Sequence, residues 1–245
     1  MRLLIVIWVA LATWGVPLFA QFQAGDVAVI AYNADVTDSF AWVALRDMPS
    51  NTVIHFTSSS VSNGWFRWGD HLGRAVSPGP LTWTSKSLLK AGSVVSWISG
   101  TQQCWSVGTL SGGVPALSAS GDQIFAYIGT IANNSAGVAP WRGDPTGAVM
   151  LYGLNFANSG WDNITGGGLN TSFIPAGISV ASHTAVHAGN WDNGYYSGIR
   201  TGAVTELLAA MALSSNWTTS ADFISPDHWP SQFKVVRGGT LIRIE

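Results

Sequence analysis

The stretch Ala24–Thr57 constrains the fold most, because it holds three apolar β-type runs in close succession. The runs are Asp26–Tyr32, Phe40–Leu45 and Thr52–Thr57, and segments rich in Asn, Asp and Pro separate them. Val, Ile, Phe, Trp and Thr fit a pleated, largely buried surface, whereas Asn, Asp and Pro interrupt one. The stretch therefore predicts a meander that begins a β-sheet.

Further short β-type runs follow along the chain, and Gly-rich or Asn-rich segments bound them. They are Leu81–Thr84, Ser93–Ile98, Gln123–Ile128, Ala148–Phe156, Gly177–Val186, and a closing hairpin of Lys234–Val236 with Thr240–Ile244. Many short strands with Gly-rich turns are typical of a β-sandwich. We therefore predict an all-β fold, a single β-sandwich-like domain without a linker that divides it.

One segment has the apolar spacing of a helix face, with positions i, i+3, i+4 and i+7 occupied. These positions are Val204, Leu207, Leu208 and Met211. Thr201 is a suitable N-cap residue just before them, and Asn216 lies shortly after the last of them. The pattern predicts one short helix near residues 202–213.

The composition favours a well-packed protein with little surface charge. Charged residues are 10% of the chain, against about a quarter in ordinary domains. Apolar residues are 47%, and 13 tryptophans add bulk to a core. The formal net charge is −2, and the sequence shows no basic patch that could neutralise phosphates, so we do not expect nucleic-acid binding.

The first 20 residues have the layout of a secretory signal peptide. Arg2 gives a positive start, Leu3–Trp14 is apolar, and Ala20 supplies a small residue for cleavage. We expect residues 21–245 to form a secreted domain, extracellular or at the cell surface, with no membrane span after cleavage. A retained anchor or a buried first strand is the alternative. Cys104 is the single cysteine, so it is either a buried apolar side chain or half of an intermolecular disulfide.

Several motifs recur in an order that is similar to one known type of module. They include AGDVAVIAYNAD, FAWVALRDMPSNTVIHFT, LTWTS, LKAGSVVSW, SASGDQIFAYIG and MLYGLNFANSGWD, which span roughly Ala24–Thr218. The chain resembles a β-rich module of secreted bacterial proteins, some of which carry sorting tails or extracellular nuclease domains. The resemblance implies an extracellular location and no catalytic residues. Ser58-Ser59-Ser60 stands where the module is usually acidic, which puts a metal role of that loop in doubt.

Residue patterns for catalysis or tight metal binding are weak. His183 and His187 could share a metal, but the Glu of the zinc-protease pattern and a third ligand are missing. Glu206 and Glu245 are the only Glu residues, and most Asp residues belong to turns. An Asp-dependent hydrolase with two carboxylates in one cleft is therefore the least favoured function. We expect no cofactor; calcium is the one ion that Asp-containing turns could hold, although no EF-hand loop is present.

Tryptophans in turn-like segments are the best candidates for ligand or interface contacts, because an exposed ring can stack on a sugar or anchor a partner. The candidates are Trp65, Trp68, Trp161 and Trp191. The competing interpretation is that each ring closes one end of the sandwich core. Four N-glycosylation sequons, at Asn133, Asn163, Asn170 and Asn216, would carry glycans only if the source uses a eukaryotic secretory pathway.

These patterns favour a secreted, non-catalytic structural or adhesive module. Low surface charge lowers repulsion between copies, and flat β-edges can pair, so self-association in an extracellular layer, matrix or fibre is expected. The expected partners are other copies of the chain or extracellular matrix and glycans. A carbohydrate-binding module that uses the loop tryptophans is the alternative.

Overall fold

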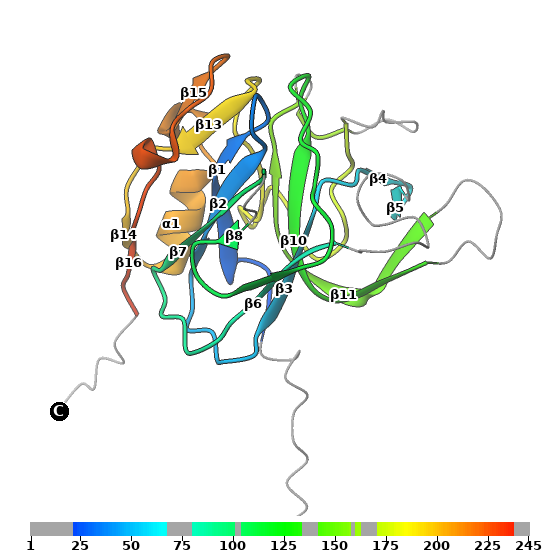
Figure 1. Ribbon diagram of the computed structural model, residues 1–245, viewed down its shortest axis with the longest axis horizontal. Helices are drawn as coiled ribbons and strands as arrows, with labels where there is room; N and C mark the ends of the chain where they lie inside the picture. The colour runs from blue at the N-terminus through cyan, green and yellow to red at the C-terminus, as the bar shows by residue number, and fades with distance from the viewer. Residues whose placement is uncertain are drawn as a thin grey trace, which may run out of the picture.

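The computed structural model describes residues 22–67, 80–100, 104–133, 142–157, 160–162 and 171–237. In these residues the chain folds into two β-sheets that pack face to face, with one α-helix beside them (Figure 1). The predicted all-β, sandwich-like fold with one short helix is confirmed. The predicted signal peptide lies outside the described residues. No helix in the described ranges is long and apolar enough to span a membrane.

The first sheet has six antiparallel strands in the order β15-β13-β1-β2-β7-β8. In chain order they are β1 (Val27–Asn33), β2 (Ser39–Ala44), β7 (Val94–Ile98), β8 (Cys104–Trp105), β13 (Asn193–Tyr196) and β15 (Trp217–Ser220). Every residue of β1 and β2 is buried, so both faces of these central strands are covered. This explains why their sequences read as continuous apolar runs instead of alternating ones.

The second sheet contains eight strands, in the order β4-β5-β11-β10-β3-β6-β9 with β12 parallel to β11. They are β3 (Val53–Thr57), β4 (Val61–Ser62), β5 (Trp65–Arg67), β6 (Leu81–Thr84), β9 (Thr109–Ser111), β10 (Gln123–Asn133), β11 (Arg142–Asn155) and β12 (Ala185–His187). The third run of the predicted meander thus belongs to the other sheet. Buried Met48, bridged to Leu89, carries the chain from one sheet across to the other.

The helix α1 (Val204–Met211) buries Leu207, Leu208 and Met211, as the spacing predicts. Its N-cap is Ala203, and the Glu206 carboxylate accepts a hydrogen bond from the Ala203 N–H at 2.8 Å. The prediction of Thr201 as cap is wrong, because Thr201 belongs to β14.

Three short elements complete the C-terminal part of the fold. β14 (Thr201–Gly202) pairs in parallel with β16 (Lys234–Val235), and two 3-10 turns lie at Ser214–Asn216 and Pro226–His228. The first run of the predicted closing hairpin, Lys234–Val236, thus contains β16, and the hairpin itself stays a prediction. Its second strand, residues 240–244, lies outside the described residues. The predicted run Gly177–Val186 is mostly turns, and only its end joins β12.

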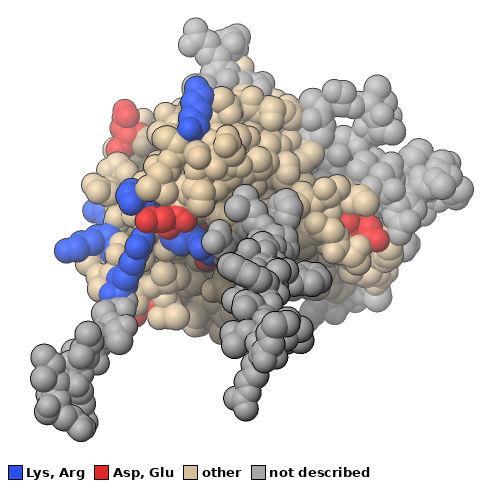
Figure 2. Space-filling view, turned by 90° about the horizontal axis from the view of Figure 1, so that it is seen from below, with Lys and Arg blue, Asp and Glu red and all other residues tan. Residues whose placement is uncertain are grey.

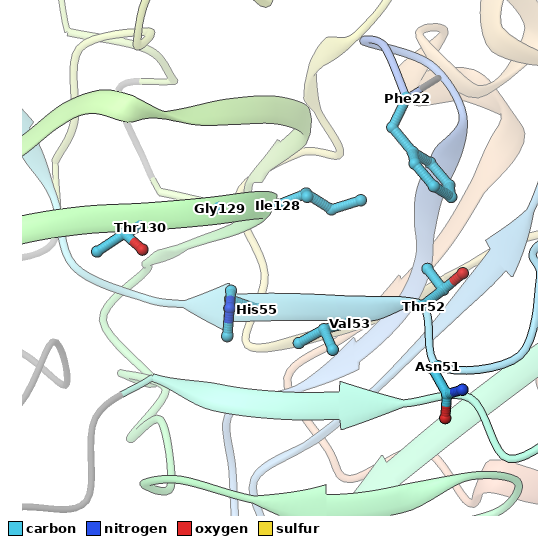
Figure 3. A pocket seen from close by; sticks show the side chains of 8 residues that line it. All are labelled: Phe22, Asn51, Thr52, Val53, His55, Ile128, Gly129 and Thr130. Carbon is cyan, nitrogen blue, oxygen red and sulfur yellow. The ribbon is translucent and has the colours of Figure 1, made fainter. Parts of the chain in front are cut away.

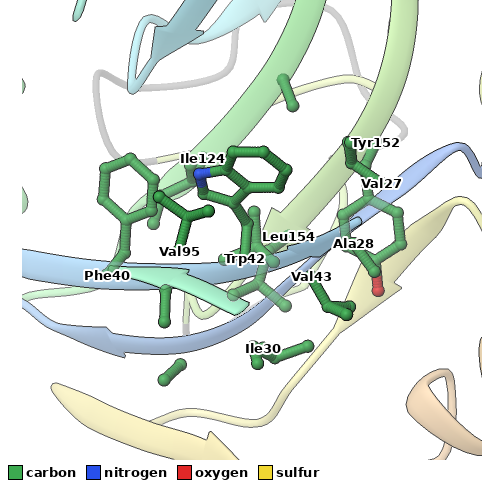
Figure 4. Packing of buried hydrophobic residues seen from close by; sticks show 14 of the residues in the cluster. Val27, Ala28, Ile30, Phe40, Trp42, Val43, Val95, Ile124, Tyr152 and Leu154 are labelled. Carbon is green, nitrogen blue, oxygen red and sulfur yellow. The ribbon is translucent and has the colours of Figure 1, made fainter. Parts of the chain in front are cut away.

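The core between the sheets is unusually aromatic (Figure 4). Trp42 of β2 packs edge-on against Trp83 of β6, with ring centroids 4.9 Å apart. Phe40 of β2 packs against Phe56 of β3 at 5.1 Å. Because these pairs join strands of different sheets, aromatic contact holds the two layers together.

A second apolar cluster covers the opposite face of the second sheet. Along β10, Ile124 and Ala126 face the main core, whereas Phe125 and Tyr127 face the second cluster. This is the period-2 alternation of a strand with both faces buried. Loop residues such as Ile178 close over this outer face.

We predict that Trp42→Ala destabilises the protein by about 3–5 kcal/mol, because it removes a fully buried ring at the sheet interface and leaves a cavity. Trp191→Ala, at an exposed ring, is the matched control and should change the free energy of unfolding by no more than about 0.5 kcal/mol. Urea denaturation followed by circular dichroism measures both. Equal losses in the two variants would contradict this assignment of the core.

Candidate functional site

Loops from three parts of the chain meet at one end of the sandwich, where β1 ends. The Ala34 N–H donates to the Asp192 carbonyl at 2.9 Å, and the Tyr32 hydroxyl donates to the Trp191 carbonyl at 3.1 Å. The Asn33 side-chain amide donates to the Ile224 carbonyl at 2.9 Å. These contacts place residues 34–38, 188–192 and 221–225 side by side, and we call this surface the acidic end.

Two buried asparagines fix the acidic end. Asn33 and Asn193 face each other across the β1–β13 pair and are fully buried. Asn33 also accepts a hydrogen bond from the Ile224 N–H at 3.3 Å, and the Asn193 amide donates to the carbonyls of Ser220 and Ala221, both at 3.4 Å. Buried amides that bond backbone in this way hold a loop in one conformation.

The charges of the acidic end all have one sign, since its loops contain no Lys or Arg. These loops contain four aspartates, Asp35, Asp38, Asp192 and Asp222. Burial, and next the charge of Asp35, raises the pKa of the Asp192 carboxyl. Asp38 also accepts a hydrogen bond from the Leu117 N–H at 3.1 Å. The end is therefore electronegative.

The same end exposes large apolar side chains. Val36 is 86% exposed, Trp191 49%, Phe223 41%, and Ile98, at the end of β7, 38%. Val36 has a φ of 64°, and this left-handed conformation is strained for a β-branched residue, by about 1–3 kcal/mol. A strained, exposed valine beside an exposed tryptophan marks a surface suited to contact with a partner.

The opposite end of the sandwich gathers basic side chains from separate segments, and we call it the basic end. The Met48 N–H bonds the Leu89 carbonyl, the Gly92 N–H bonds the Ala44 carbonyl, and the Phe233 N–H bonds the Gly92 carbonyl, so these segments are adjacent. Their Lys and Arg residues are Arg46, Lys86, Lys90, Arg200, Lys234 and Arg237. Figure 2, the view from below, shows blue side chains gathered on one side around acidic atoms. Sequence reasoning missed this basic patch, because its members are far apart in the chain.

Asp47 joins two segments of the basic end. Its carboxylate accepts a hydrogen bond from the Ala91 N–H at 2.9 Å and contacts Arg237 at 2.8 Å and Lys90 at 3.4 Å. These partners, the Ala91 N–H first, lower the pKa of Asp47 to about 2. A hollow of about 540 Å³ lies between this group and the start of α1.

A second ion pair lies next to it. Arg46 contacts the Asp26 carboxylate at 3.1 Å, and its guanidinium stacks 4.9 Å from the centroid of the Phe22 ring. Burial nevertheless raises the pKa of Asp26, and the Gln23 N–H and Arg46 offset this only in part. The pair thus places a largely buried carboxylate beside a guanidinium at the edge of the basic end.

The predicted tryptophan candidates do not form one site. Trp191 is exposed at the acidic end, and Trp65 is half-buried on β5. Trp161 packs against Phe125 with ring centroids 5.7 Å apart, so it helps to close the second cluster. Trp68 lies outside the described residues.

Of the sequon asparagines, Asn216 is half-buried, and its side-chain amide donates to the Ala210 carbonyl at 2.8 Å. A glycan would leave this nitrogen a single N–H, which could keep that bond. Asn133 ends β10, and nothing is described of its side chain. Asn163 and Asn170 lie outside the described residues. The Cys104 side chain is likewise not described, although its backbone belongs to β8.

In the described part of the chain, the histidines do not share one site. His187 Nε2 lies 2.9 Å from the Ala157 carbonyl, and His183 adopts a left-handed backbone conformation in a turn. Within the described ranges, no three His, Cys, Asp or Glu residues gather as metal ligands. His55 is different, because it lines a pocket on the second sheet (Figure 3).

Comparison with models of protein families, with characterised proteins and with solved structures gives no match. The resemblance to modules of secreted bacterial proteins therefore stays a prediction.

We predict that the free energy of unfolding decreases as the pH falls below about 6.5, partly because of His55. Burial lowers the pKa of His55 from its usual 6.5, so the unfolded chain takes up a proton at a pH where the folded chain does not. Tyr127, whose ring centroid is 5.2 Å away, is the titratable group that faces the ring, and it is neutral in this range because burial raises its pKa.

His55→Gln should therefore flatten the pH profile of the unfolding free energy, measured by urea denaturation between about pH 7 and pH 5. His228→Gln, at an exposed position, is the control. An unchanged slope in His55→Gln would show that the His55 proton is not linked to folding.

Proposed function

We propose that the chain is a secreted, non-catalytic structural module whose copies associate end to end in an extracellular layer, matrix or fibre. The observation that carries the proposal is the opposite charge of the two ends of the sandwich. The loops of the acidic end contain Asp residues and no Lys or Arg. At the basic end, six Lys and Arg residues outnumber their acidic neighbours Asp26, Asp47 and Glu206.

Opposite charges favour one orientation of neighbouring copies. If like ends met, as in a two-fold dimer, charges of the same sign would face each other. A head-to-tail contact instead joins the acidic end of one copy to the basic end of the next. Such a contact leaves one free end of each kind and adds copies in an open chain unless it closes into a ring.

Apolar side chains at both ends supply area for the contact. Val36, Trp191 and Phe223 are exposed at the acidic end, and Ile199 and Val236 at the basic end. Apolar and aromatic groups at the centre of an interface contribute most of the affinity, while surrounding charges set orientation and association rate.

The described sheet edges favour the ends over the edges as contact surfaces. The edge strands β4 and β8 have two residues each and β9 has three, and β15 carries Thr218, Thr219 and Ser220. Short edge strands resist pairing with another sheet. The edge-to-edge pairing considered from sequence is therefore less favoured than contact between the ends.

The described carboxylates support a structural role because several of them hold loop backbone. Asp122 accepts hydrogen bonds from the N–H groups of Ser118 and Gln123 at 3.1 and 2.8 Å. Asp26 accepts one from the Gln23 N–H at 2.8 Å. Carboxylates used in this way shape turns and are not held ready for proton transfer.

We predict that the purified chain associates at about 0.01 M salt and dissociates at about 1 M salt, because the Debye length falls from about 30 to about 3 Å. The double variant Asp35→Lys/Asp222→Lys cancels the net charge of the acidic end, and Arg200→Glu/Lys234→Glu gives the basic end a small negative net charge. Each variant alone should stay monomeric in sedimentation velocity. An equal mixture should associate in pairs, because the unaltered basic end of the first variant can meet the unaltered acidic end of the second.

Asp144→Lys, a single charge reversal of the same kind on β11, is the control and should associate like the unmodified chain. The proposal fails if either double variant associates alone as the unmodified chain does, or if the mixture remains monomeric.

A second candidate function is carbohydrate binding at the acidic end, favoured by the exposed Trp191 ring next to Asp35 and Asp192. An aromatic ring can stack on a sugar face while carboxylates accept hydrogen bonds from its hydroxyls. If this holds, a glycan array should identify a bound sugar, and Trp191→Ala should weaken its binding about tenfold or more. Trp65→Ala is the control. An array without any bound glycan would remove this candidate.

A further inference from the structure

A pocket of about 280 Å³ opens on the second sheet, away from the charged ends, between β3, β10 and the segment that precedes β1. Figure 3 shows Phe22 and Thr130 on opposite sides of the view, with Val53 and Ile128 between them. His55 also lines it, from the middle of β3. Most of the lining is apolar, and its few polar groups come from His55, Thr130 and the start of β3.

Hydrogen bonding fixes which nitrogen of His55 carries the proton. His55 Nδ1 lies 2.8 Å from Thr82 Oγ1, and the Thr82 hydroxyl donates to the Pro80 carbonyl at 3.0 Å. We assign the Thr82 proton to this carbonyl, which can only accept, because both contacts are hydrogen bonds only if the Thr82 oxygen accepts from His55 Nδ1–H. His55 Nε2 is then an acceptor with a free lone pair, without a hydrogen-bond partner in the described part of the chain.

The backbone requires glycine at one position of the pocket lining. Gly129 on β10 has a φ of 92°, and a Cβ at this position would lie 2.3 Å from the Gly147 carbonyl oxygen of β11. The volume is close to the lower limit of about 300 Å³ for small-molecule pockets, which restricts an occupant to about the size of one ring.

We infer that this pocket binds a small, ring-sized apolar molecule that carries one hydroxyl group, and that His55 Nε2 accepts the hydrogen bond from that hydroxyl. Phe22, Val53 and Ile128 supply apolar contact for the ring. The fixed tautomer of His55 selects a donor over an acceptor, and the lowered pKa keeps the imidazole neutral near pH 7. The site is independent of the contacts between copies proposed above.

The test uses the full chain with p-cresol and toluene as matched probes, because they share a ring and a methyl group and differ in the hydroxyl. Titration is followed through the backbone amide resonances of Val53, His55, Gly129 and Thr130. We expect p-cresol to shift them in a saturable way, with a dissociation constant on the order of a millimolar. Toluene should bind about three- to tenfold more weakly, since it cannot make the hydrogen bond.

Two variants separate the hydrogen bond from the apolar contact. His55→Leu keeps an apolar lining without the acceptor, so p-cresol and toluene should bind equally. Val53→Phe fills the pocket with a residue that favours strands, so both probes should lose binding. The inference is overturned if neither probe causes a saturable shift, if the shifts lie elsewhere in the chain, or if the preference for p-cresol persists in His55→Leu.

Discussion

Contact between aromatic side chains of the two sheets is the interaction on which the rest of this structure depends. The chain has a single cysteine and so cannot form an internal disulfide, and the layers are joined by pairs such as Trp42 with Trp83 and Phe40 with Phe56. Burial of large rings on both sides of the interface supplies stabilisation that disulfide bonds give in many small domains. It also makes the central strands rigid supports for the loops at their ends.

The same packing explains where the charges lie. Both faces of β1 and β2 are buried, and a charged side chain on either face would lose its hydration. Charged residues therefore lie only before or after these strands. β1 and β2 are antiparallel, hence Asp35 and Asp38 in the connection between them lie at one end, while Arg46 and Asp47 after β2 lie at the other. The polarity of the molecule thus follows from strand direction. The His55 pocket lies apart from both ends, on a strand whose outer face is only partly covered.

Sequence patterns predicted the strands and the helix well, because apolar runs and the i, i+3, i+4 spacing report burial directly. They could not predict that β3 leaves the opening meander, since that depends on how Met48 crosses between sheets. Trp161 and Trp191 show the limit most clearly. Each precedes an Asp-Asn pair, yet one ring is packed against Phe125 and the other is exposed. Local sequence is the same, and only long-range packing distinguishes them. The basic end was missed for a related reason, because its residues meet only after folding.

The central claim is that neighbouring copies meet acidic end to basic end. It can be tested directly by zero-length cross-linking of carboxylates to lysines in a mixture of isotopically light and heavy chains, read out by mass spectrometry. The account predicts mixed-isotope cross-links that join Asp35 or Asp222 of one copy to Lys90 or Lys234 of another. Mixed-isotope links that join Asp47 or Glu206 of one copy to a lysine at the basic end of another, or an absence of links between copies at concentrations where the chain associates, would contradict it.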